Sequence, residues 1–121
     1  MTTVDDAIAA FRHAAIEKGA FAGPRARDHA LHAAMAAAWR ALHAQGQAGL
    51  QAFESLLNDE SRFVRTWVAA VLISRGDNRG VAVLEADAEM RDRHGFSSQM
   101  VLREWRAKRL KCPFGEVDGT G

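Results

Sequence analysis

The sequence predicts an all-α protein of about six helices, connected by short loops into three antiparallel pairs. Apolar residues recur at helical spacing along most of the chain, whereas the alternation of apolar and polar residues that marks a strand never lasts more than a few positions. Residues 63–73 are apolar except for Arg65 and Thr66. A surface helix has one apolar face and this one has two, so we expect it to lie in the middle of the domain.

The first two predicted helices occupy residues 3–18 and 25–44. Thr3 and Asp6 form a pair that resembles a capping box at the start of the first helix. Pro24 suits the first turn of the second helix, because its missing amide proton is not needed there. The apolar stripes are Val4, Ile8, Phe11 and Ala15 in the first helix and Leu31, Met35, Ala38, Trp39 and Leu42 in the second.

Four shorter helices follow. The third is predicted at residues 50–58, and a polar turn at 58–61 leads into the central helix around 63–73. The residues that we expect to separate or cap these helices are Gly46 and Gly49 before the third, Gly76 after the fourth, Asp77 at the start of the fifth, Gly95 at its end, and Ser97 or Ser98 at the start of the sixth. The sixth helix is anchored by Val101, Leu102 and Trp105.

Length and composition fit one ordinary globular domain. The chain has 121 residues, of which 48% are hydrophobic and 26% charged, and this balance excludes wholesale disorder. We expect a helical domain at residues 1–112 and a flexible tail at 113–121, where glycines and acids show no periodicity. The formal net charge is +1, so charge as a whole favours neither nucleic acid nor membrane as a partner.

The bacterial cytoplasm is the expected location. No stretch approaches the roughly 20 apolar residues that a membrane-spanning helix needs. The N-terminus carries Asp5 and Asp6 and lacks the basic-then-apolar order of a secretory signal. The single cysteine, Cys112, excludes an internal disulfide and a four-cysteine metal site.

Residues 50–72 contain a recognisable pattern, Leu50-x-x-Phe53-x-x-Leu56-Leu57-x-Asp59-x-x-x-x-Val64-Arg65-x-x-x-Ala69-Ala70-x-Leu72. This pattern resembles a HEAT-type repeat of two helices. Val64 is expected to fill the groove between the paired helices, and Trp67 to anchor the core. Arg65 lies near the apolar side, so its guanidinium needs acceptors, which Asp59 and the carbonyls that end the preceding helix can supply.

The wider chain, from about residue 26 to residue 110, resembles a family of small bacterial HEAT-like proteins described as a domain of unknown function. The landmarks are the alanine-rich helix before Gly46, the Val-Arg-x-Trp-x-Ala-Ala segment at residues 64–70, and the Leu-x-x-Trp at residues 102–105. The resemblance implies a short α-α superhelical array that binds partners, and it implies no catalytic residues. We also expect no cofactor and no metal. Small HEAT-like bacterial proteins include immunity or antitoxin partners of toxins, so such a role is one expectation.

Several side chains could carry chemistry, but a structural role is the simpler interpretation of each. His29, His32 and His43 flank the apolar stripe of the second predicted helix, and a zinc site there would need a third ligand and support around it. Cys112 follows a lysine, but a nucleophile needs a base held beside it. The acids Glu85, Asp87 and Glu89 are expected on a solvated face, with Glu89 paired to Arg93 at i,i+4.

A basic cluster is expected at the end of the sixth helix. Its members are Arg103, Arg106, Lys108, Arg109 and Lys111. Basic residues favour the C-terminus of a helix through its dipole, and they could also contact phosphates.

Three hypotheses follow: a non-enzymatic protein-binding module, a nucleic-acid-binding helical protein that uses the basic cluster, and an enzyme or metal protein that uses the histidines. We favour the first, with a protein partner, no membrane contact and a monomer or homodimer. Phe11 and Phe21 are candidates to cap the ends of the array or to mediate self-association.

Overall fold

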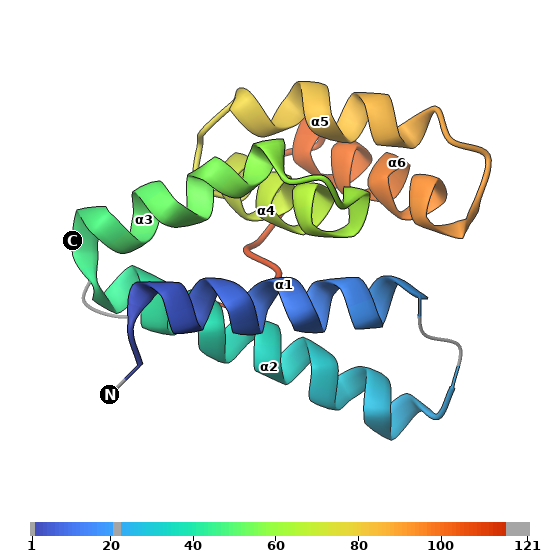
Figure 1. The fold of residues 1–121 in the computed structure, drawn as a ribbon. Helices are drawn as coiled ribbons and strands as arrows, with labels where there is room; N and C mark the ends of the chain where they lie inside the picture. The colour runs from blue at the N-terminus through green and yellow to red at the C-terminus, as the bar shows by residue number, and fades with distance from the viewer. Residues whose placement is uncertain (1, 21–22, 116–121) are drawn as a thin grey trace. The chain divides into compact units, whose positions relative to one another are not determined.

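The computed structural model describes residues 2–20 and 23–115, and this part of the chain contains helices and no strand. The all-α class with six helices is therefore confirmed (Figure 1). The second predicted helix agrees with the observed one at both ends. The third begins at Gly46 and not at Leu50, so Gly46 and Gly49 lie within it and not before it, and the junction of the fifth and sixth helices, described below, differs most. The helices are α1 (Val4–Ala20), α2 (Arg25–Ala44), α3 (Gly46–Ser55), the short 3-10 helix η1 (Leu56–Asn58), α4 (Arg62–Ser74), α5 (Arg79–Ala88) and α6 (Arg93–Arg106).

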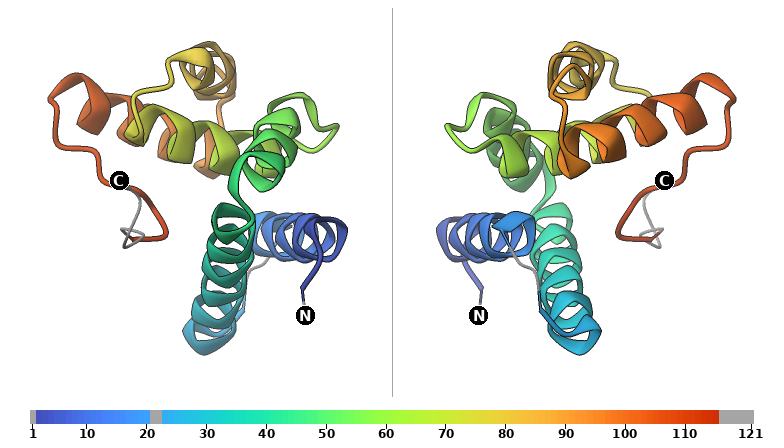
Figure 2. Two further views of the ribbon diagram at one scale, coloured as in Figure 1. Left: turned by 90° about the vertical axis from the view of Figure 1, so that its left-hand side faces the viewer. Right: turned by 90° about the vertical axis from the view of Figure 1, so that its right-hand side faces the viewer.

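The helices form two compact units. Within the described residues, unit 1 comprises residues 2–20, 23–56 and 114–115, and unit 2 comprises residues 57–113. In unit 1, α2 packs against α1 and α3; in unit 2, α5 packs against α4 and α6 (Figures 1 and 2). Each unit is thus a group of three helices, which differs from the three pairs that the sequence predicts. The physical reason in unit 1 is that only Gln45 separates α2 from α3, so that α3 stays against the helices that precede it.

Aromatic side chains form the core of unit 1. Phe11, Trp39 and Phe53 are fully buried, and the ring centroids of Phe11 and Phe53 lie 5.2 Å apart at an interplanar angle of 79°. The Trp39 and Phe53 rings lie 4.7 Å apart. The Phe11–Phe53 contact is edge-to-face and the Trp39–Phe53 contact is tilted, and such aromatic pairs add to the stabilisation that burial provides. Phe11 is therefore a core residue and not the exposed cap that the sequence predicts, while Phe21 lies outside the described residues.

Phe114 belongs to the core of unit 1. It is 5% exposed, and its ring meets Phe11 edge-on at 5.8 Å and His32 at 5.3 Å. Phe114 lies in the segment predicted as a flexible tail from residue 113, and a lone phenylalanine carries no periodicity that would reveal its burial. Residues 116–121 of the predicted tail lie outside the described part of the chain.

The core of unit 2 lies between α4, α5 and α6. Its buried members are Ala69, Ile73, Leu84 and Leu102, and half-buried residues including Trp105 and Leu110 pack against them. Eight of the thirteen residues of α4 are buried, as expected of a helix with two apolar faces. A Cβ added at Gly80 would lie 2.5 Å from the carbonyl oxygen of Ala69, so the glycine permits the close approach of α5 to α4.

The junction of α5 and α6 corrects the predicted boundaries. The N-cap of α6 is Asp92, whose carboxylate accepts a hydrogen bond from the Gly95 amide at 2.8 Å, so the predicted caps Ser97 and Ser98 lie inside the helix. Gly95 does not end α5, because it lies in the first turn of α6. A Cβ there would lie 2.1 Å from the Met90 carbonyl oxygen, which shows that this glycine serves a close approach of the backbone.

Candidate functional site

A buried carboxylate lies at the end of α5 in unit 2. Asp87 is 7% exposed and accepts hydrogen bonds from Arg62 Nε at 2.7 Å and from Ser98 Oγ at 2.7 Å. A buried charge needs a countercharge and hydrogen bonds, and these two donors supply both. The residues connected in this way, directly or through one another, are called the Asp87 cluster: Arg62, Thr66, Asp87, Asp92, His94 and Ser98.

Arg62 links the three helices of unit 2. It is the first residue of α4, and besides Asp87 on α5 it contacts Asp92, with Nη1 at 2.6 Å and Nη2 at 3.1 Å from the two carboxylate oxygens. The hydrogen bond from Arg62, followed by that from the Gly95 amide, lowers the pKa of Asp92 to about 2. The bonds to Asp92 and Asp87 in turn raise the pKa of Arg62. The N-cap of α6 is therefore fixed by an ion pair as well as by its own amide bond.

His94 completes the cluster from the first turn of α6. Its Nε2 lies 2.7 Å from Thr66 Oγ1, and the Thr66 hydroxyl is also 2.9 Å from the Arg62 carbonyl oxygen. The Thr66 hydroxyl donates its single proton to that carbonyl, so its oxygen accepts a hydrogen bond from the N–H at Nε2 of the neutral His94 imidazole. Phe63 meets the imidazole edge-on at 4.8 Å. Burial lowers the pKa of His94, although the Asp87 carboxylate, 3.9 Å away, acts in the opposite direction.

The geometry of the Asp87 cluster suits a structural tie better than catalysis. Thr66 and Ser98 are 5% and 3% exposed, and the hydroxyl proton of each is already donated to a neighbour. A nucleophile must reach substrate and give its proton to a base. Asp87 is too far from His94, at 3.9 Å, to orient the imidazole by a hydrogen bond.

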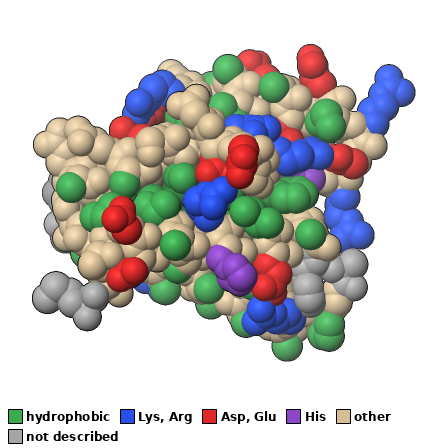
Figure 3. Space-filling view, in the orientation of Figure 1, with side chains coloured by type: hydrophobic (Ala, Val, Ile, Leu, Met, Phe, Trp, Pro, Cys, Tyr) green, Lys and Arg blue, Asp and Glu red, His purple; other side chains and the backbone are tan. Residues whose placement is uncertain are grey.

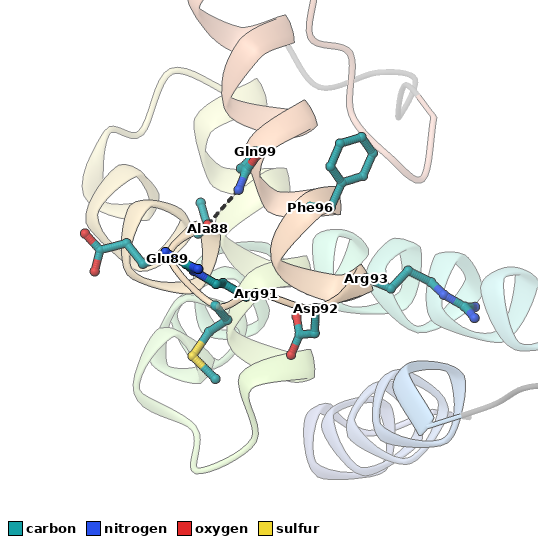
Figure 4. Close-up of a pocket in the computed structure, with 8 residues that line it drawn as sticks. Ala88, Glu89, Arg91, Asp92, Arg93, Phe96 and Gln99 are labelled. Atoms are coloured by element: carbon teal, nitrogen blue, oxygen red, sulfur yellow. Dashed lines mark hydrogen bonds between the residues drawn. The ribbon is translucent and has the colours of Figure 1, made fainter.

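An open groove adjoins the cluster where α5 ends and α6 begins. It encloses about 500 Å³, and Figure 4 shows the side chains around it. Gln99 closes one side, because its amide nitrogen donates to the Ala88 carbonyl oxygen at 2.9 Å. Asp92 belongs to both the groove and the Asp87 cluster. We call this feature the Phe96 groove, and its lining residues are Ala88, Glu89, Met90, Arg91, Asp92, Arg93, Phe96 and Gln99.

The Phe96 groove is bordered by exposed apolar side chains. Phe96 is 58% exposed and Met90 49%, and Ile16 is the other large hydrophobic residue that is exposed in the described part of the chain. Arg91 and Arg93 are exposed beside them, and neither forms an ion pair within residues 2–20 and 23–115. The groove thus combines a phenylalanine, a methionine and two arginines whose side chains face solvent.

The residues predicted from the HEAT-like pattern have structural positions. Arg65 Nη1 donates to the main-chain carbonyls of Asp59 at 2.8 Å and Glu60 at 3.0 Å. The predicted bond between Arg65 and Asp59 is present, but its acceptor is the carbonyl, whereas the Asp59 carboxylate accepts from the Ser61 amide. Val64 is fully buried and Trp67 is half-buried.

The basic cluster extends beyond α6. The helix ends at Arg106, so Lys108, Arg109 and Lys111 follow it, and Lys108 has a positive φ of 61°. Arg106 pairs with Glu85 at 3.3 Å and Arg109 with Glu104 at 3.0 Å, while Arg103 is exposed in the last turn. On the face of the molecule drawn in Figure 3, basic and acidic side chains are interspersed.

The candidate metal and redox residues belong to different units. His29 is exposed, His32 contacts Phe114, and His43 meets Trp39 edge-on at 5.6 Å, all in unit 1. Cys112 is half-buried in unit 2. Within the described ranges, no group of three or more His, Cys, Asp or Glu side chains could hold a metal ion. Over the same ranges, every helix is too short or too polar to cross a membrane.

Sequence reasoning missed the Asp87 cluster. Glu85 and Glu89 are exposed as predicted, but Asp87 is buried. One feature of the sequence does indicate the burial of Asp87: Gly80, Leu84 and Asp87 recur at helical spacing, which places Asp87 on the buried side of α5. The predicted pair of Glu89 with Arg93 is not formed in the described structure, because α5 ends at Ala88 and the two residues are not on one helix.

Comparisons with models of protein families, with curated proteins and with solved structures found no match to this chain.

Proposed function

We propose that the protein is a non-enzymatic protein-binding module and that the Phe96 groove is its docking surface. The observation that carries this proposal is Phe96 itself, a phenylalanine 58% exposed beside an open groove. The centres of protein interfaces are enriched in aromatic residues, methionine and arginine, and the groove presents all three.

The Asp87 cluster supports this role because it fixes the groove before a partner arrives. Arg62 holds Asp92, and Asp92 holds the Gly95 amide, so the junction between α5 and α6 has a defined conformation. A surface that is already ordered loses less conformational entropy on binding. The cluster therefore contributes to binding indirectly, by positioning the residues that contact the partner.

The HEAT-like pattern of residues 50–72 favours the same class of function. Arrays of helical repeats present extended surfaces to protein partners, and an immunity or antitoxin role in a bacterial cytoplasm is the finer form of this proposal. The immunity or antitoxin role rests on the resemblance of the sequence pattern alone. One fold supports many functions, so the pattern does not by itself identify the partner. Co-purification with a toxin encoded beside the gene would support it directly.

Two matched variants test the proposal. Phe96→Ser removes the exposed apolar side chain of the groove, and Ile16→Ser removes an exposed apolar side chain from α1 in unit 1. Proteins captured at stoichiometric yield by the wild type should be retained by Ile16→Ser and lost by Phe96→Ser, with equal far-ultraviolet circular dichroism for both. If the two variants capture the same proteins as the wild type, the Phe96 groove is not the docking surface.

The second candidate function is nucleic-acid binding through the basic cluster. Arg103, Lys108 and Lys111 favour it, because these exposed side chains form no ion pair in the described part of the chain. Fluorescence anisotropy with a labelled duplex at two salt concentrations tests it, since each phosphate contact makes binding weaker at higher salt. Binding that depends on salt and is abolished by Arg103→Glu/Lys111→Glu would favour this function; no binding at micromolar protein would exclude it.

A further inference from the structure

We infer that the occupant of the Phe96 groove is an acidic protein segment, one that places a large apolar side chain against Phe96 and Met90 and carboxylates against Arg91 and Arg93. This inference rests on the proposed function and specifies the chemistry of the partner. It is carried by the distribution of charge around the groove and by the placement of the two arginines beside the exposed apolar side chains.

The charge of the groove that remains uncompensated is mainly positive. Asp92 also lines the groove, and its carboxylate is already paired with Arg62 and accepts a hydrogen bond from the Gly95 amide, although its side chain remains 45% exposed. Arg91 and Arg93 have no ion pair in the described structure, and Glu89 is the one other acid in the lining. The surface that a partner would meet therefore carries two guanidinium groups and one carboxylate that have no ion-pair partner in the described structure.

The arrangement around Phe96 brings apolar and basic contacts together. Arg93 and Phe96 are three residues apart on α6 and so lie on neighbouring positions of one helix face. Figure 4 shows both side chains projecting from the α6 side of the groove, while Glu89 projects from the end of α5. A segment that covers the Phe96 ring would thus have the Arg93 guanidinium within one helical turn.

A protein segment fits this surface better than a nucleic acid does. The guanidinium fork binds a carboxylate through two parallel hydrogen bonds, and the apolar rim of Phe96 and Met90 offers a hydrophobic contact that a phosphate backbone cannot use. Glu89 would repel phosphates. Unit 2 as a whole also has an excess of positive charge, because residues 57–113 contain eleven Lys and Arg and eight Asp and Glu.

Selection of peptides tests the inference. A displayed library of random twelve-residue peptides is selected on the wild-type protein and counter-selected on Phe96→Ser. The expected result is a set of peptides that depend on Phe96 and carry one large apolar residue flanked by Asp or Glu. Peptides that depend on Phe96 but show no excess of acids would overturn the inference and leave the proposed function standing; no such peptides at all would count against both.

Charge reversal provides the second measurement. One selected peptide, made synthetically with a fluorescent label, should bind Arg91→Glu/Arg93→Glu at least about tenfold more weakly than the wild type, because each arginine becomes a repulsive charge. The matched control, Arg103→Glu/Lys111→Glu, changes the same number of charges outside the groove and should bind normally. Replacing the acids of the peptide with lysines should restore binding to Arg91→Glu/Arg93→Glu.

Three outcomes would overturn the inference. The first is equal binding of the peptide by both double variants. The second is a labelled single-stranded oligonucleotide that binds through Arg91 and Arg93 with no effect of Phe96→Ser, since the occupant would then be a nucleic acid. The third is a dimer in sedimentation velocity that Phe96→Ser dissociates, since a second copy of the chain would then fill the groove.

Discussion

Loss of Arg62 should destabilise the protein by far more than its position at the start of a helix suggests. Arg62→Met keeps most of the aliphatic stem but leaves the Asp87 carboxylate, whose side chain is 6% exposed, with the Ser98 hydroxyl as its hydrogen-bond donor. Breaking a buried ion pair by removing one partner costs about 3–5 kcal/mol. The Arg62 side chain is itself 22% exposed, so we expect the lower end of this range, about 3 kcal/mol.

A double-mutant cycle separates the ion pair from other effects. Asp87→Asn preserves the shape of the side chain and removes its charge, so Arg62→Met/Asp87→Asn leaves no buried charge unpaired. The double variant should therefore be about 1–2 kcal/mol more stable than the sum of the two single losses. Urea unfolding followed by circular dichroism at 222 nm measures each free energy of unfolding. A loss below about 1 kcal/mol for Arg62→Met, which is the range of a surface pair, would refute the assignment; strictly additive losses would do the same.

Three other perturbations test separate parts of the structure. The urea midpoint should fall as the pH drops below about 6.5. The pKa of His94 is lowered in the folded state, so the unfolded chain binds the proton first and protonation favours unfolding. His94→Gln should remove this fall in stability. A further loss is expected between about pH 4 and pH 2, since the pKa of Asp92 is about 2 when folded. Gly95→Ala should lower the free energy of unfolding, measured by thermal or urea unfolding, by about 1–3 kcal/mol, because the added Cβ would collide with the Met90 carbonyl oxygen. Alanine usually stabilises a helix relative to glycine, so a gain in stability would contradict this close approach. Phe114→Ala should cost about 3 kcal/mol, whereas Phe96→Ala, which truncates an exposed phenylalanine, should change the free energy of unfolding little; equal effects would show that Phe114 is not a core residue.

The helical class could be predicted because it depends on local patterns. Pro24 and Gly46 bracket α2, and the predicted range 25–44 is the observed one. The apolar run of the central helix led to the expectation of burial on several sides, and eight residues of α4 are buried. The predicted helix boundaries are wrong where a polar side chain caps the helix, as Asp92 caps α6. The sequence alone does not distinguish an aspartate that caps a helix from one in a loop.

The Asp87 cluster was not predicted because its contacts join distant parts of the chain. Arg62 is 25 residues from Asp87, and Ser98 is 11 residues away on the next helix. Periodicity indicates which side of a helix is buried, but it does not indicate which polar partners meet there. The same limit applies to Arg65, for which the sequence indicates Asp59 and nearby carbonyls as acceptors without deciding between them. In the structure the Asp59 and Glu60 carbonyls accept from Arg65, while the Asp59 carboxylate accepts from the Ser61 amide.

Asp92 connects the stability of unit 2 to its proposed binding surface. Its carboxylate ties α6 to Arg62, and the same residue forms part of the groove that Phe96 borders. Perturbing the tie and perturbing the surface should therefore have different signatures. Arg62→Met lowers stability and, by loosening the α5–α6 junction, should also weaken peptide binding. Phe96→Ser should abolish binding and leave the free energy of unfolding almost unchanged, because the side chain is already exposed. If Phe96→Ser destabilised the fold as much as Arg62→Met, Phe96 would be a structural residue and the groove would lose its main argument as a docking site.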